Sequence, residues 1–202
     1  MSIYSNIIKN NNESQLGGIK YRILFTSAKY ITSCPALSAT KTTDDHYQTA
    51  TGNFTFKDAG GGFNILEAIN RTPDLKWESV GNPGSLKSKL ILEFDVPGVQ
   101  SALARFLFLS KNDDLIMVLE RTDCTGKRYL FGGCCLPAIV TKYVGGFGKK
   151  PEDDVKTTFT LEANAEGLPV MLADAVVLPI ISTPPTSGDF DGNDFDETDF
   201  NV

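Results

Sequence analysis

Short segments in which apolar and polar side chains alternate run along most of this chain. The alternation is clearest in residues 87–96 (KSKLILEFDV) and 156–162 (KTTFTLE). Because successive side chains of a strand point to opposite faces, this pattern predicts strands that bury one face. Strand-like composition also predicts strands at residues 20–33, 47–56 with a break at Gly52, 137–144, and once or twice within 168–181.

A hairpin and two helical segments complete the expected elements. Residues 115–122 and 127–131 flank a polar turn in which Gly126 can supply a positive φ. Residues 63–69 place four apolar side chains at helical spacing, and residues 100–105 hold good helix formers that run into a strand ending at Leu109. About eight strands with one or two short flanking helices are typical of a β-sandwich or partial barrel.

The composition divides the chain into three parts. Residues 1–181 are expected to form a single β-rich domain, and residues 182–188 (STPPTSG) have the composition of a linker. Residues 189–202 form an extended acidic tail in which Phe190, Phe195 and Phe200 each follow an aspartate. A spacing of five matches neither a helix nor a strand, so our hypothesis is that these phenylalanines dock into apolar grooves, on the same subunit or a neighbour.

The charge balance changes when it is divided by position. The chain holds 25 acidic and 19 basic residues, but six of the acidic ones lie in the tail, which leaves 19 of each sign in the body. A neutral body argues against the clustered lysines and arginines that bind nucleic acid or anionic lipid. No signal-peptide pattern or apolar span long enough for a membrane is evident, so we expect a soluble protein made in the cytoplasm.

The residues that carry chemistry form no recognisable catalytic or metal-binding motif. The chain has one histidine, His46, in a polar segment, and lacks nucleophile-elbow, zinc-protease and dinucleotide-binding patterns. An aspartate-rich stretch of the tail departs from a calcium loop at the required glycine and glutamate positions. We therefore expect no enzyme activity, metal or cofactor. The four cysteines are interpreted as reduced, buried thiols: Cys34, Cys124, Cys134 and Cys135.

A compact block of opposite charges lies in the Gly-rich segment before residue 156. Lys149 and Lys150 are followed closely by Glu152 and Asp153. The block is either a solvated loop or a contact in which the lysines of one copy meet the carboxylates of the next. Charged contacts of the second kind determine partner choice more than affinity.

The run from the hairpin onward, LIMVLERTDCTGKRYLFGGCCLPAIV and then GGFGKKPEDDVKTTFTLEANAEGLPV, covers about residues 115–170. It resembles the phage tail tube and tail-tube-like proteins in its GKRYLFG segment before a small-residue stretch and its late DxxxTFTLE strand. The resemblance implies a β-sandwich or partial barrel whose copies form stacked, usually hexameric rings with inner sheets joined into one barrel. It also implies a location in the virion, assembly in the host cytoplasm, and an acidic or neutral lumen that passes DNA without binding it.

Other functions remain open from the sequence. The tail tube family does not ordinarily carry a Phe-rich acidic extension, which leaves another virion part, such as a neck, head-completion or decoration protein. A carbohydrate- or receptor-binding β-sandwich is a further alternative, because Trp77 and six tyrosines could supply a stacking platform. A hydrolase without a recognisable motif is the third.

Overall fold

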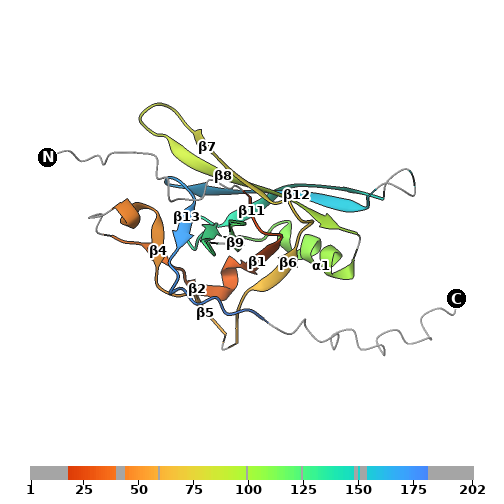
Figure 1. Cartoon of the computed structure of the whole chain (residues 1–202), viewed down its shortest axis with the longest axis horizontal. Helices are drawn as coiled ribbons and strands as arrows, with labels where there is room; N and C mark the ends of the chain where they lie inside the picture. Colours follow the sequence, from red (N-terminus) through yellow and green to blue (C-terminus); the bar gives the residue numbers. More distant parts are fainter. Residues whose placement is uncertain are drawn as a thin grey trace.

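Strands dominate the described residues, and they lie in two layers with the α-helix α1 at their side (Figure 1). The mainly β fold class expected from the sequence is therefore confirmed. This computed structural model describes residues 18–39, 44–58, 60–98, 100–123, 125–147, 150 and 154–181.

The first layer, here called the upper sheet, contains four antiparallel strands in the order β7–β8–β12–β11, and it lies across the top of Figure 1. Its centre is the long pairing of β8 with β12, as the alternating sequence predicts. The strands are β7 (Asp74–Val80), β8 (Lys87–Pro97), β12 (Lys156–Ala165) and β11 (Ala138–Gly146).

The second layer, the lower sheet, has the order β6–β1–β9–β10–β13–β4–β3. It joins the upper sheet through one residue pair, Ala138 of β11 with Leu115 of β9. Its strands are β6 (Asn64–Glu67), β1 (Arg22–Ser27), β9 (Leu115–Glu120), β10 (Arg128–Phe131), β13 (Val170–Leu172), β4 (Thr49–Thr51) and β3 (Ala36–Leu37).

The main core fills the space between the two sheets. The helix α1 (Ser101–Ser110) closes one side of it, because the Phe106 ring packs edge-on against Phe25 at 5.0 Å and against Phe159 at 5.6 Å. Burial of this apolar surface is the main stabilising contribution to the sandwich. Fully or almost fully buried side chains of this core include Ile23, Leu92, Phe94, Met117, Leu119, Phe131, Phe159 and Leu161.

A second apolar cluster covers the opposite face of the lower sheet. Its cover consists of β2 (Ile31–Ser33), β5 (Thr55–Phe56) and the chain that follows β13. Phe63 lies at its centre, fully buried, with its ring edge-on to Phe54 at 4.9 Å and to Phe56 at 5.6 Å. The described residues therefore bury both faces of the lower sheet but only one face of the upper sheet.

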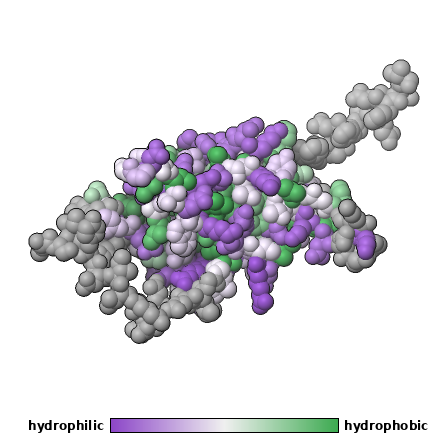
Figure 2. All heavy atoms as spheres, turned by 90° about the horizontal axis from the view of Figure 1, so that it is seen from above, coloured by the Kyte–Doolittle hydropathy of each residue, from purple (hydrophilic) through white to green (hydrophobic). Residues whose placement is uncertain are grey.

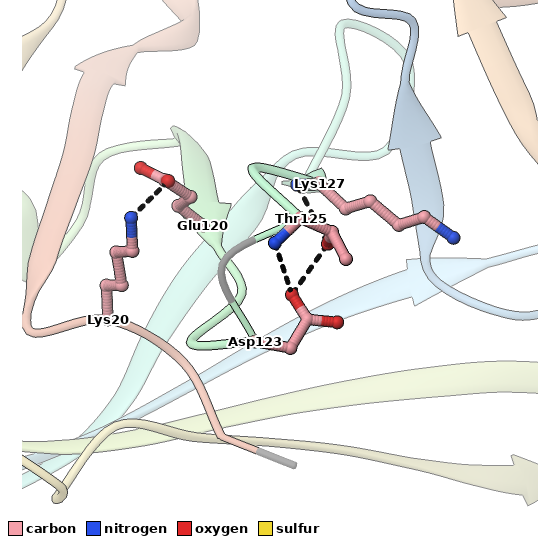
Figure 3. A network of polar contacts seen from close by, with 5 residues as sticks. All are labelled: Lys20, Glu120, Asp123, Thr125 and Lys127. Atoms are coloured by element: carbon pink, nitrogen blue, oxygen red, sulfur yellow. Dashed lines mark hydrogen bonds and ion pairs between the residues drawn. The ribbon is translucent and has the colours of Figure 1, made fainter. Parts of the chain in front are cut away.

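The hairpin expected from the sequence is present as β9 and β10. Figure 3 shows its turn, where an Asp123 carboxylate oxygen accepts hydrogen bonds from the Thr125 amide at 3.2 Å and the Thr125 hydroxyl at 2.6 Å. The hydroxyl hydrogen bond is the largest cause that holds the pKa of Asp123 below its usual value. Gly126 adopts a φ of 68°, the positive angle that the sequence predicted at this position.

Two of the expected segments are interrupted. The strand predicted at residues 20–33 divides into β1 and β2 around a 3-10 helix at Ala28–Tyr30. The break predicted at Gly52 is confirmed, because this glycine has a φ of 91° between β4 and β5. A second 3-10 helix, Asp44–Tyr47, contains the half-buried His46 and takes the first residue of the strand predicted at 47–56, so that β4 begins only at Thr49.

Three helix and strand predictions are wrong. Residues 63–69 do not form a helix, because residues 64–67 pair with β1 as strand β6 and the segment is too short to gain much from helical hydrogen bonds. The helix predicted to end at residue 105 continues to Ser110, since Leu103, Phe106 and Ser110 all face the core at helical spacing. Strand β7 was not predicted.

The interpretation of the cysteines as reduced, buried thiols is also wrong. Cys34, which follows β2, forms a disulfide with Cys134, which follows β10, and their Cα atoms are 5.8 Å apart. Cys135 is a free and exposed cysteine. Cys124 lies outside the described residues.

Candidate assembly surface

The upper sheet has an unpaired edge on each side. Within the described part of the chain, β7 pairs only with β8. β11 pairs with β12 along its length, but its other edge meets β9 only at Ala138. Residues 139–146 of β11 therefore present backbone groups that no described strand pairs. Such edges are templates for a further strand.

The side chains of the upper sheet are separated cleanly by face. The registers place Leu92 and Phe159 on the core face and the intervening residues on the outer face. Figure 2, which views the molecule from above, shows hydrophilic side chains interleaved with scattered hydrophobic ones. The outer positions hold five acidic and five basic residues, a net charge of zero: Asp74, Glu78, Glu93, Asp95, Glu162, Lys76, Lys87, Lys89, Lys142 and Lys156.

Most of these charges are paired across neighbouring strands. The Lys89 ammonium lies 2.8 Å from Glu162. The Lys76 ammonium lies 2.7 Å from Glu93 and 3.1 Å from Asp74, and the hydrogen bond to Glu93 is the largest cause that raises the pKa of Lys76. Opposite charges placed side by side on a sheet stabilise it modestly and leave little field above it.

The most buried of these pairs joins β8 to β12. Asp95 accepts hydrogen bonds from the Lys156 ammonium and the Thr158 hydroxyl, both at 2.6 Å. Burial of the carboxyl raises its pKa, but the hydrogen bonds from Lys156 and Thr158 outweigh burial and leave the pKa of Asp95 below its usual value. The same contact raises the pKa of Lys156. Both groups therefore stay charged at neutral pH.

The two unpaired edges carry large side chains that the other described residues leave uncovered. Trp77 of β7 is 55% exposed and Tyr143 of β11 is 51% exposed, although both lie on the core face of their strands. Beside β11, the end of α1 exposes Phe108, and Lys111 lines an open groove of about 370 Å³ with residues 140–143. Phe147, just after β11, is exposed as well. Apolar side chains gathered at an open edge are typical of a surface that binds a partner.

Of the candidate residues named from the sequence, one is described and the others lie outside the described residues. Lys150 is exposed and belongs to the loop that joins β11 to β12. Lys149, Glu152 and Asp153, from the same loop, lie outside the described residues. The same is true of the tail phenylalanines Phe190, Phe195 and Phe200.

Sequence reasoning missed the residues of β7 and the ion pairs of the outer face. Leu75, Trp77 and Ser79 alternate with charged residues, which is a strand signal, but only Leu75 and Trp77 are apolar. The described residues contain no group of three His, Cys, Asp or Glu side chains that could hold a metal ion, and none of their helices is long and apolar enough to cross a membrane.

Comparison of this chain with models of protein families, with curated proteins and with solved structures finds no match.

Proposed function

We propose that this chain is a structural subunit of a phage tail tube or a related injection machine. Its copies assemble into rings, expected to be hexameric, which stack into a conduit for DNA within the virion. One observation carries the proposal: the described residues leave the four-stranded sheet with an unpaired edge on each side, apart from the contact at Ala138, and with an uncovered outer face whose net charge is zero. The role is structural, with no catalytic step and no cofactor.

The open edges support ring closure by strand pairing. β11 of one copy pairs with β7 of the next, so that each edge satisfies the backbone groups of the other. Trp77 and Tyr143 both lie on the core face, so this pairing places them on the same side of the joined sheet. Contact with the neighbouring copy covers the aromatic side chains of Trp77 and Tyr143. Aromatic side chains contribute strongly to the affinity of such interfaces.

The outer face supports the role of a lining. In a closed ring of upper sheets this face lines the lumen, since the body of each subunit lies on the core side (Figure 1). Binding to DNA depends mainly on unpaired lysines and arginines that displace counterions from phosphates. Three of the five lysines on this face, Lys76, Lys89 and Lys156, pair with carboxylates. Because the face as a whole also has no net charge, we expect it to pass DNA without holding it.

The test is electron microscopy and light scattering of the purified full-length chain, with one edge blocked by charge. Wild-type protein is expected to form rings or tubes. Val144→Lys on β11, where Val144 is 56% exposed, is expected to give folded monomers, because lysine on an edge strand opposes pairing. Leu168→Lys is the matched control, since Leu168 is 57% exposed and lies in the loop between β12 and β13, outside both edge strands. A wild-type monomer, or equal assembly of both variants, contradicts the proposal.

The same purified protein distinguishes two alternative functions. Rings that never stack favour a neck, head-completion or decoration protein. The exposed ring of Trp77 favours a carbohydrate- or receptor-binding module instead. Trp77 is the only tryptophan of the chain, so its fluorescence reports directly on its surroundings. An emission that shifts to shorter wavelength on assembly supports the tube, and one that changes only when sugars are added supports the binding module.

A further inference from the structure

A groove lies on the face opposite the upper sheet's outer face, beside the last part of the described chain. We call residues 173–181, which follow β13, the C-terminal strap. The groove is open, with a volume of about 410 Å³, and we call it the strap groove. Side chains of β1, β9 and β10 line it with those of the strap: Arg22, Leu24, Val118, Glu120, Arg128, Val176, Val177, Leu178 and Ile180.

The strap is fixed in place along this groove. The Arg128 guanidinium donates hydrogen bonds to the carbonyl oxygens of Val176 at 3.0 Å and of Ala173 and Asp174 at 3.1 Å. Near the other end, the Phe63 amide donates to the Pro179 carbonyl at 2.8 Å, and the Ile181 amide donates to the Phe63 carbonyl at 2.9 Å. The groove is therefore a built feature of the fold.

The walls of the strap groove combine apolar surface with positive charge. Val177 and Ile180 expose their side chains to solvent although they are apolar. Figure 3 shows that Glu120, the one carboxylate of the lining, is paired with Lys20. Arg22 and Arg128 against Glu120 give the lining a net charge of +1. Arg22 forms no ion pair with any described residue, although Glu67 lies opposite it in the pairing of β1 with β6.

We propose that the strap groove is the docking site of the chain's own acidic tail, residues 189–202. The tail carries six acidic residues, no basic residue, and three phenylalanines. Its phenylalanine rings cover the apolar walls, while neighbouring aspartates meet Arg22 and Arg128. Charge and apolar surface thus match on both sides of the contact.

The position of the tail in the chain favours this occupant. The last described residue, Ile181, directly follows a residue of the groove lining. Phe190 is nine residues further on, and nine residues reach up to about 30 Å when extended. A short linker also gives the tail an effective concentration on the order of millimolar at its own groove. The N-terminal segment, residues 1–17, carries one basic and one acidic side chain and so lacks this charge match.

The occupation of the groove does not require a tube. A monomer of any function presents the same side chains, so the tail can dock whether or not rings form. Failure of ring assembly and failure of docking are consequently separate results.

The test uses a fluorescent peptide of residues 183–202 and full-length protein, with binding followed by fluorescence anisotropy. In one protein variant, Phe190, Phe195 and Phe200 are all changed to Ser, which disables its own tail. This variant is expected to bind the peptide at least tenfold more tightly than wild type, in which the groove is already occupied. Adding Arg22→Gln is expected to weaken binding at least fivefold, whereas the matched control Arg105→Gln, on the exposed side of α1, leaves it unchanged.

Four results would overturn the proposal. The first is no binding of the peptide to the triple-serine variant, and the second is equal binding to that variant and to wild type. The third is the same loss from Arg22→Gln and Arg105→Gln. A peptide of residues 1–17 that binds the triple-serine variant as tightly as the tail peptide also assigns the groove to a different segment and counts against the tail.

Discussion

The two sheets of this protein share one core but differ in what covers their other faces. Every residue of β9 from Leu115 to Leu119 is buried, because the lower sheet lies between the main core and the second apolar cluster. In β12 of the upper sheet, buried Phe159 and Leu161 alternate with Thr158 and Thr160, which reach the outer face. A continuous apolar strand therefore marks a sheet that is covered twice, and an alternating strand marks a sheet with a free face.

This difference assigns distinct tasks to the two sheets. The lower sheet stabilises the fold, since the strap, strands β2 and β5 and a disulfide hold its second apolar cluster in place. The outer face of the upper sheet is left uncovered by the described residues, and three cross-strand ion pairs stabilise it. Substitutions in the second apolar cluster should consequently lower the free energy of unfolding more than substitutions on the outer face of the upper sheet.

The largest effect is expected for Phe63→Ala in the second cluster. Removing this fully buried ring leaves a cavity between Phe54 and Phe56, and we expect a loss of about 3–5 kcal/mol in the free energy of unfolding. Chemical denaturation measures the loss. Phe147→Ala, at a ring that is 76% exposed, is the control and should change stability by less than about 0.5 kcal/mol. Equal losses would mean that the cover does not seal the lower sheet.

The next largest effect is expected when the Cys34–Cys134 disulfide is removed. The bond joins residues separated by 100 positions and ties the cover strand β2 to the loop that leads into β11. Serine at both positions should lower the free energy of unfolding by roughly 2–4 kcal/mol, because the unfolded chain loses a long closed loop. Guanidinium unfolding with and without reductant measures this loss.

The same experiment contains its own controls. Reduced wild type should unfold at the same denaturant concentration as the double-serine variant. Cys135→Ser should match oxidised wild type, since Cys135 is exposed and forms no disulfide. If reductant does not shift the unfolding midpoint of wild type, the disulfide contributes nothing to the free energy of unfolding.

The fold was predictable from sequence wherever a segment determines its own structure. Alternation identified β8 and β12, and a glycine able to adopt a positive φ located the β9–β10 turn. The segment at residues 63–69 was mistaken for a helix because, over so short a length, its four apolar side chains fit the period of a helix as well as that of a strand. The pairing of Leu66 with Ile23 of β1 decides its structure, and no local pattern shows that contact.

The candidate surface was less predictable, because it depends on contacts between distant residues. Asp95 and Lys156 are 61 positions apart, and only the β8–β12 register brings them together. The partner of Cys34 is likewise set by the packing of the two layers. Trp77 was noted as part of a stacking platform, but its position on an edge strand follows from the topology of the sheet and could not be derived from spacing.

A smaller effect, with a distinctive pH dependence, is expected on the free face for Asp95→Asn. The substitution weakens the hydrogen bonds from Lys156 and Thr158, and we expect a loss of about 1 kcal/mol at neutral pH, a low value because the lysine is nearly half exposed. The pKa of Asp95 lies below its ordinary value of 3.8 in the folded protein. Its contribution is therefore complete above that value and is lost as the pH falls through the lower folded pKa.

Unfolding of wild type and Asp95→Asn between pH 2 and pH 8 tests this assignment. The difference in their free energies of unfolding should be constant above about pH 5 and should shrink below about pH 4, because the wild-type carboxyl is then protonated as well. Glu78→Gln removes another carboxylate from the same face, one with no ion pair among the described residues, and should change little. A difference that instead shrinks well above pH 4 would mean that burial raises the pKa of Asp95. The outer face of the upper sheet would then hold a neutral carboxyl in place of a charged pair.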